Sequence, residues 1–348
     1  MTIDSETERG TKLMKKILPV EYPPITSYIS IAHMLSALWP LKEVIMPWFC
    51  QQYIQLASTK RFGHFYDCVY DEMVPFPVKC PFFEVQLLDK RRMHNYPEKF
   101  SEFLEFHLLK DCYVVTGVDE YYVNCAWNYQ KNHYVHQALF YGCDTKEKKF
   151  FLSDFFGDKY TQTEISYEQI DEGDRYTPKE LDKWFHEVSI FNYLERHEPY
   201  PLNIELMKLF IHDYINSRDS FHKINFSRYR EGDHYEYGLQ YYDNMAILIA
   251  NQREHIDIRP FHVLYDHKVA MLIRLEYLYQ NSFFDSDTYK GLCFEMNQLK
   301  KENFNLRQMV LKYNFRPERV NLDSIIHKCM SLKQKEYDAF SFLLKALS

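Results

Sequence analysis

His136 and Asp154 are the residues whose types and spacing most directly suggest chemistry, since they lie 18 positions apart around a pattern typical of a β-hairpin. The sequence predicts an apolar strand over residues 137–141, a polar turn over 144–148 and a second apolar strand ending at Asp154. In an antiparallel hairpin the start of one strand lies beside the end of the next, so the imidazole and the carboxylate become neighbours. A carboxylate beside a histidine fixes its tautomer and stabilises the imidazolium, which is the base half of a nucleophile–base–orienter triad.

Each member of this pair also has an ordinary structural interpretation. His136 could be a half-buried histidine at a strand start, and Asp154 could cap a turn. His133 is a rival for the role of base, because a shift of one strand residue changes the face of the sheet on which a side chain lies. His136 is preferred because it adjoins the predicted strand directly.

The nucleophile predicted to act with this pair is Ser27, at the head of a short helix. A Pro-Pro pair precedes it and favours an extended approach, because residues before proline disfavour helix. A nearly all-apolar helix is predicted over residues 27–38, capped by Thr26 or Ser27 and stopped by Pro40. A short helix that is apolar on most sides is usually buried in a core.

Two cysteines are rival nucleophiles. Cys50 lies in a helix predicted from residue 48 to about 58, and Cys80 has prolines nearby. Both fit a buried structural role better than a reactive one. The 8 cysteines are scattered, with no C-x-x-C pair and no zinc-type spacing, so the sequence predicts no metal site and favours reduced thiols in a cytosolic protein.

The rest of the pattern predicts an α+β chain with a loose boundary near residue 175. We expect a mobile arm over residues 1–18, a mostly β domain over 19–175 and a helical domain over 176–348. The first domain is predicted to be irregular to β over 64–92, helical over 97–110, and extended over 113–116 and 120–125. A Thr-Pro pair at 177 opens a helix, and helical spacing then marks residues 204–217, 237–251, 260–280 and 286–313.

Composition excludes several classes of function. The chain has 348 residues and a net charge of −7, so no overall basic field draws it to nucleic acid or to an anionic membrane. With 9 glycines and neither a G-x-G-x-x-G nor a G-x-x-x-x-G-K-[ST] motif, it has no glycine-rich phosphate loop. The charged N-terminus has no apolar stretch typical of a signal peptide, and no run of 18 or more apolar residues stands out, so we expect no signal peptide, no membrane span and a cytoplasmic location.

The order of these parts, a buried helix followed by β structure with His136 and Asp154, resembles the plan of papain-like enzymes. The hairpin pattern is similar to that of the papain-like peptidases that process bacteriocin leaders. The chain from about residue 20 to 345 resembles the butirosin-type aminoacyltransferase family, with softer matches at Tyr237-Gly-Leu-Gln-Tyr-Tyr-Asp and Ile256-Asp-Ile-Arg-Pro-Phe-His. This resemblance implies a papain-like domain, in which a buried helix accompanies an antiparallel sheet, and a mainly helical C-terminal domain.

The resemblance implies an acyltransferase. Relatives take an acyl group from the phosphopantetheine thioester of a carrier protein onto an enzyme cysteine, and pass it to an amine to form an amide. No cofactor is bound by the enzyme itself, because phosphopantetheine arrives on the carrier-protein substrate; the implied partners are that carrier protein and a small amine. This chain departs from the family in having Ser27 in place of the cysteine. Three interpretations stay open: an engineered Cys-to-Ser change, a native serine nucleophile, and an inactive chain kept for binding.

Other residues are assigned weaker roles. Tyr22 is the nearest side-chain donor to the expected oxyanion site, since the papain-type glutamine is absent. Arg259, His262 and Asp266 share one helix face and are candidates for binding substrate, although an interdomain salt-bridge network with Asp257 and His267 explains them as well.

Two further interpretations concern the partner and the reaction. The run Lys90-Arg91-Arg92 could dock an acidic carrier protein, or could simply be solvated surface. Two other functions also remain: a hydrolase or peptidase with the same triad, and a catalytically inactive scaffold that binds carrier protein.

Overall fold

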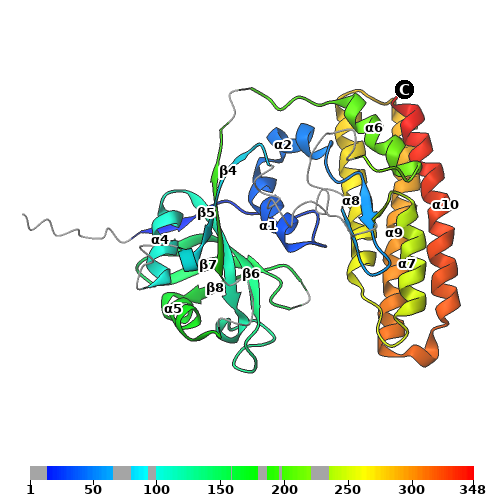
Figure 1. The fold of residues 1–348 in the computed structure, drawn as a ribbon. Coiled ribbons are helices and arrows are strands. Elements are labelled where there is room, and N and C mark those ends of the chain that lie inside the picture. Colours follow the sequence, from blue (N-terminus) through cyan, green and yellow to red (C-terminus); the bar gives the residue numbers. More distant parts are fainter. Residues whose placement is uncertain are drawn as a thin grey trace, which may run out of the picture. The chain divides into compact units, whose positions relative to one another are not determined.

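The computed structural model describes residues 14–65, 80–92, 99–157, 159–178, 186–195, 198–220 and 235–348. The chain divides into two compact units. The first unit comprises Met1–Tyr22 and Pro81–Glu195, and the second comprises Pro23–Cys80 and Arg196–Ser348 (Figure 1). This division differs from the expected boundary near residue 175, because the segment with the predicted nucleophile belongs with the C-terminal helices.

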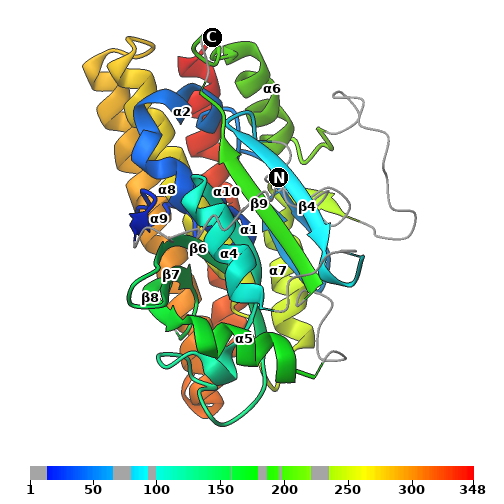
Figure 2. The same cartoon turned by 90° about the vertical axis from the view of Figure 1, so that its left-hand side faces the viewer.

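The first unit is built on a 7-stranded antiparallel sheet with the order β4-β9-β5-β6-β7-β8, to which β1 adds by pairing with β6 (Figure 2). The strands are β1 (Lys15–Ile17), β4 (Phe83–Asp89), β5 (Cys112–Asp119), β6 (Val135–Asp144), β7 (Lys149–Asp154), β8 (Thr161–Ser166) and β9 (Glu187–Tyr193). The predicted hairpin of residues 137–154 is therefore present as β6 and β7.

Two helices, α4 (Phe100–Leu109) and α5 (Tyr167–Tyr176), lie against this sheet. Short 3-10 turns are formed by η3 (Lys90–Arg92) and η4 (Glu120–Tyr122). The core of the unit contains Leu104 and Leu108 of α4, Ile170 of α5, and sheet residues such as Val114 and Phe140. This apolar layer packs against one face of the sheet that contains the β6–β7 hairpin.

β1 corrects the expectation of a mobile arm over residues 1–18. Residues 1–13 lie outside the described residues, but Lys15–Ile17 pairs with β6 and Leu18 donates to the carbonyl of Tyr141 at 2.7 Å. The close approach depends on Gly142, because a Cβ there would lie 2.5 Å from the backbone oxygen of Lys16. The register of β6 against β7 also shifts between Phe140 and Gly142, so a β-bulge marks the place where β1 joins.

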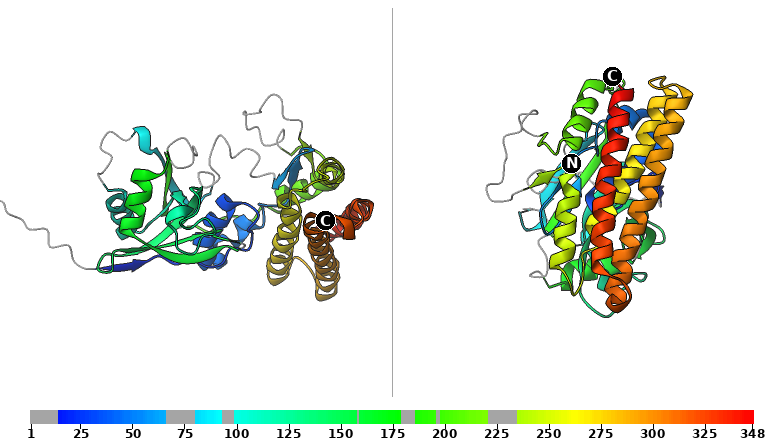
Figure 3. Two further views of the ribbon diagram at one scale, coloured as in Figure 1. Left: turned by 90° about the horizontal axis from the view of Figure 1, so that it is seen from below. Right: turned by 90° about the vertical axis from the view of Figure 1, so that its right-hand side faces the viewer.

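The second unit is mainly helical and carries a 3-stranded antiparallel sheet with the order β10-β2-β3. Helix α9 packs against α8 and α10, and α10 also packs against α6 and α7 (Figure 3). The elements are α1 (Ile29–Leu38), η1 (Trp39–Leu41), α2 (Lys42–Phe49), β2 (Leu56–Ser58), β3 (Gly63–Phe65), α6 (Ile204–Ile215), β10 (Glu236–Tyr237), α7 (Gln240–Asn251), α8 (Arg259–Gln280), α9 (Ser286–Phe315), η7 (Pro317–Arg319) and α10 (Leu322–Ala346).

A buried polar network lies inside the helices of this unit. Lys268 of α8 and Glu336 of α10 form an ion pair with both side chains fully buried. Glu336 also accepts hydrogen bonds from the hydroxyl groups of Tyr214 and Tyr242. Because every added partner offsets the cost of removing a charge from water, the pair is tolerated only as a complete network.

Three predictions of secondary structure are wrong. The helix expected over residues 48–58 ends at Phe49, because the buried Arg274 donates to the carbonyls of Cys50 and Gln52 at 2.8 and 2.6 Å and Tyr53 adopts a positive φ of 57°. Residues 120–125 begin with the η4 turn in place of a strand. β9 lies in the region expected to be helical, and the helix predicted to open at residue 177 falls mostly outside the described residues.

The predicted α+β class is confirmed, with an antiparallel sheet and a helical C-terminal region. Within the described residues, one stretch, Ile29–Phe49, is long and apolar enough to cross a membrane. It comprises α1, η1 and α2, and 56% of its apolar window is buried. A buried core helix passes the same test of length and composition.

Candidate active site

His136 and Asp154 form the hydrogen bond that the hairpin pattern predicts. Nδ1 of His136 lies 2.7 Å from Oδ2 and 2.9 Å from Oδ1 of Asp154. Leu139 pairs with Ser153 in the β6–β7 ladder, so one step further Asp154 comes opposite residue 138, two positions from His136 on the same face. The contact is therefore diagonal across the hairpin.

Asp154 is buried and hydrogen-bonded. Its side chain is 1% exposed, and Oδ1 also accepts a hydrogen bond from the backbone N–H of Phe155 at 2.7 Å. Burial raises the pKa of the Asp154 carboxyl from 3.8 to about 6, against the lowering effect of the His136 hydrogen bond. At neutral pH Asp154 is a carboxylate, so it fixes the Nδ1–H tautomer of His136 and leaves Nε2 as the basic nitrogen.

A second histidine–carboxylate pair, not predicted from the sequence, lies in the same unit. His133, the rival base, has Nδ1 2.6 Å from Oδ2 of Asp119 at the end of β5. Asp119 also accepts hydrogen bonds from the backbone N–H groups of Tyr121 and Tyr134 and from the hydroxyl of Thr177. Four donors on one carboxylate tie the loop between β5 and β6 to its strands, so this pair has a sufficient structural role. The signal in the sequence was an aspartate at a strand end, as at Asp154.

Ser27 lies just before α1, and the predicted capping is wrong. The helix begins at Ile29 and its N-cap is Tyr28, which makes no side-chain capping bond. The backbone N–H groups of Thr26 and Ser27 instead donate to Oδ2 of Asp266 at 2.7 and 2.8 Å. A carboxylate from α8 thus supplies the negative charge that favours a helix N-terminus, which the local sequence could not reveal.

His262 joins the same cluster but is not arranged as a base. Its Nε2 lies 2.9 Å from the hydroxyl oxygen of Thr26, and Nη1 of Arg307 lies 3.1 Å from its Nδ1. Arginine can only donate, so Nδ1 is the acceptor and Nε2 carries the hydrogen. His262 therefore donates toward Thr26. Among the predicted substrate-binding residues, His262 and Asp266 hold the Ser27 segment, whereas Arg259 pairs with Asp257 at 2.7 Å and is largely exposed.

The hydroxyl oxygen of Ser27 is buried and has no hydrogen-bond partner in the part of the chain that the structure describes. Ser27 belongs to the second compact unit, whereas His136 and Asp154 belong to the first. Tyr22, the proposed oxyanion donor, also belongs to the first unit, where it is 61% exposed and lies edge-on to Tyr160 with ring centroids 6.2 Å apart.

The two rival cysteines are poor nucleophiles. Cys50 and Cys80 are both buried. Burial raises the pKa of the Cys50 thiol from 9.0 to about 12, so the thiolate is scarce near neutral pH. The structural interpretation of Cys50 accordingly agrees with its surroundings.

The basic run Lys90-Arg91-Arg92, a candidate docking site, is largely paired with carboxylates. Lys90 is buried, lies 2.9 Å from Asp174 and sits 3.6 Å from the centre of the Phe100 ring. Arg91 and Arg92 are both exposed, but Arg91 pairs with Asp89 at 2.7 Å and Arg92 lies 3.9 Å from the same carboxylate. A three-residue cationic patch is therefore not formed.

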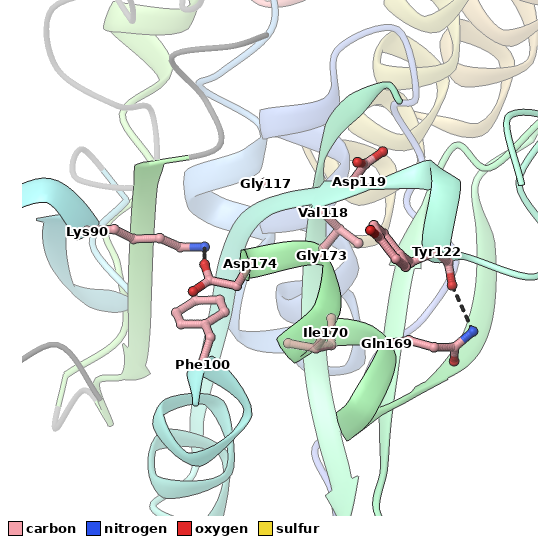
Figure 4. Close-up of a pocket in the computed structure, with 10 residues that line it drawn as sticks. All are labelled: Lys90, Phe100, Gly117, Val118, Asp119, Tyr122, Gln169, Ile170, Gly173 and Asp174. Carbon is pink, nitrogen blue, oxygen red and sulfur yellow. Dashed lines mark hydrogen bonds and ion pairs between the residues drawn. The ribbon is translucent and has the colours of Figure 1, made fainter. Parts of the chain in front are cut away.

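Lys90 also lines a small pocket of the first unit with Phe100, Asp119, Gln169 and Asp174 (Figure 4). The pocket has about 10 Å³ of room, which suits one water molecule and no organic substrate. Across the described ranges, no group of three or more His, Cys, Asp and Glu residues is placed to hold a metal ion.

No family model and no curated protein matches this chain.

Proposed function

We propose that this protein is a papain-like acyltransferase that forms an amide by moving an acyl group from a carrier-protein thioester to an amine. The observation that carries the proposal is the hydrogen bond between His136 and the buried Asp154. In this assignment Ser27 is the nucleophile, His136 is the general base and Asp154 orients it. The resemblance to the butirosin-type family supplies the substrate class, and the position of Ser27 just before a buried helix agrees with it.

The first half of the reaction makes an acyl-enzyme. The Ser27 hydroxyl oxygen bonds to the thioester carbonyl carbon, its proton passes to Nε2 of His136, and the carbonyl π electrons move to oxygen as an oxyanion. When this intermediate collapses, the C–S bond breaks and the thiolate leaves with the proton from His136. Asp154 stabilises the imidazolium that exists between these two transfers.

The second half transfers the acyl group to an amine. The amine nitrogen bonds to the ester carbonyl carbon, His136 takes its proton, and the C–O bond to Ser27 breaks as the proton returns to the serine oxygen. Because water could replace the amine, amide formation requires that solvent be excluded. A hydrolase that uses the same residues would differ only in the second half, where water takes the place of the amine. A scaffold that only binds carrier protein would neither form the acyl-enzyme nor transfer the acyl group.

The replacement Ser27→Cys tests the nucleophile. A thiol is a far better nucleophile than a serine hydroxyl, so the variant should form an acyl-enzyme with a small thioester, seen as a mass increase. Adding His136→Ala should abolish this labelling, whereas His133→Ala is the matched control and should preserve it, because His133 belongs to the other pair.

Two results separate the alternatives. If the Ser27→Cys variant folds but its thiol at position 27 is labelled no faster than that of Cys50, residue 27 is not the nucleophile. This result would favour the inactive scaffold that binds carrier protein. With an acylating enzyme, free acid formed equally with and without candidate amines would indicate a hydrolase, whereas amide formed only with amine indicates the transferase.

A further inference from the structure

The two amide groups in front of α1 are already occupied by an internal anion. The N–H groups of Thr26 and Ser27 converge on the single oxygen Oδ2 of Asp266. Consecutive backbone N–H groups that point at one oxygen are the arrangement with which proteins bind anions and stabilise oxyanions. Asp266 is 2% exposed, so this carboxylate is a fixed part of the second unit.

The carboxylate is held in place by a chain of neighbours. Nε2 of His262, one helical turn away on α8, lies 3.4 Å from Oδ1 of Asp266. Arg307 of α9 stands behind His262, and its guanidinium also lies over the rings of Tyr265 and Phe304. Asp266 is thereby fixed in contact with the backbone at position 27.

We infer that Asp266 is a positioning residue that acts as an internal latch on the nucleophile, an inference that rests on the proposed function of Ser27. The oxyanion formed during attack by Ser27 needs the same Ser27 N–H group that Asp266 holds. The negative carboxylate also repels that oxyanion. Acylation therefore requires that the N–H groups break their hydrogen bonds to Asp266 and donate to the oxyanion. A thioester whose binding does not cause this change of partner should react slowly.

The charge of Asp266 can be measured directly at position 27 in the Ser27→Cys background. The thiol pKa is obtained from the pH dependence of iodoacetamide alkylation, followed by mass spectrometry on the peptide that carries residue 27. Asp266→Asn keeps an oxygen acceptor and removes the charge, so we expect the thiol pKa to fall by about one unit, since like charges within ~4–6 Å raise the pKa of an acid. Alkylation well below the pKa should become about tenfold faster.

Asp257→Asn is the matched control. It makes the same charge change just before the same helix, at a carboxylate that pairs with Arg259. The control should leave the thiol pKa unchanged. An unchanged pKa in a natively folded Asp266→Asn variant would overturn the latch. Should that variant fail to fold, Asp266→Ser keeps a short hydroxyl acceptor without charge and is judged by the same shift.

Different results would reject the latch of Asp266 and the triad of Ser27, His136 and Asp154. If His136→Ala leaves the reactivity of the residue-27 thiol unchanged, the proposed function falls, and the latch with it, whereas the Asp266 shift still measures the local field. If His136→Ala abolishes reactivity but Asp266→Asn shifts nothing, the triad stands and the latch is removed. Faster acylation of Ser27→Cys by thioester when Asp266 is neutral supports both.

Discussion

The carboxylate of Asp154 reaches His136 diagonally across the β6–β7 hairpin, with both of its oxygens within 2.9 Å of Nδ1. The imidazole is the more exposed partner, since its side chain is 28% exposed and that of Asp154 is 1% exposed. The polar ring thus reaches solvent while its orienting group stays in the core.

Asp154→Asn should strongly reduce acyl transfer while leaving the fold intact. The amide cannot stabilise the imidazolium and favours the wrong tautomer of His136, so the rate should fall at least about a hundredfold. The measurement is kcat/KM, or the rate of acyl-enzyme formation in the Ser27→Cys background. Asp119→Asn is the control at the other histidine pair. Equal losses in both variants would show that the effect is structural.

The acid limb of activity should lie near pH 6. Burial raises the pKa of Asp154 to about 6, so below that pH the carboxyl takes up a proton and no longer stabilises the imidazolium. Acylation measured from pH 4.5 to 8 should therefore rise through about pH 6. Asp154→Asn should move this limb to a different pH, because the carboxyl that titrates together with His136 is then gone. An acid limb that stays at the same pH in the variant shows that Asp154 does not set it.

The same raised pKa affects stability with a definite sign. Between pH 4 and 6 the folded protein retains a proton on Asp154 that the unfolded chain has released, so this group's contribution to the unfolding free energy falls as pH rises through that range. Asparagine does not titrate, so the Asp154→Asn variant lacks this loss. The free energy of unfolding of the variant minus that of the unmodified protein should therefore increase by up to about 3 kcal/mol from about pH 4 to pH 7. Urea unfolding at both pH values measures the change, and a difference with the opposite sign rejects this cause.

Lys268→Met should destabilise the helical unit by about 3–5 kcal/mol, because it leaves the fully buried Glu336 without its cation. Lys268→Met combined with Glu336→Leu should recover much of that loss, since no charge is then left in the core. Urea unfolding monitored by helical circular dichroism provides the comparison. Lys290→Met, at an exposed pair with Asp287, is the control and should change stability by less than about 1 kcal/mol.

Gly142→Ala should release β1 from β6. The new methyl group would lie 2.5 Å from the backbone oxygen of Lys16, and backbone cannot move aside cheaply. Hydrogen exchange at Lys15–Ile17 should accelerate, with a loss of about 1–3 kcal/mol in stability. Gly173→Ala is the control, because its methyl group would meet only an ordinary contact at 3.4 Å from Tyr122. Unchanged exchange at β1 would show that the strand tolerates the side chain.

The sequence predicted those features whose cause is local. Alternating apolar residues and a polar turn defined the β6–β7 hairpin, and the hairpin geometry brought His136 to Asp154. The apolar run and Pro40 likewise located α1 to within two residues at its start. These elements follow from periodicity and turn chemistry, which one stretch of chain contains.

The failures have causes that lie far away in the sequence. The end of α2 is fixed by Arg274, and the approach to α1 is fixed by Asp266, each more than 200 positions distant. Lys90 looked like solvated surface, but Asp174 and Phe100 accommodate its charge in the interior. Burial of this kind depends on tertiary partners that a linear pattern does not identify.

The hydrogen bond between Ser27 and Asp266 joins residues 239 positions apart, which has a consequence during synthesis. When residue 27 leaves the ribosome, the carboxylate that anchors its amide has not yet been translated. The first unit can be completed at Glu195, whereas the segment around Ser27 must wait for α8. Any truncated or stalled chain that stops before residue 266 therefore contains the complete first unit with His136 and Asp154, but its Ser27 segment lacks the carboxylate that anchors it and is open to proteolysis.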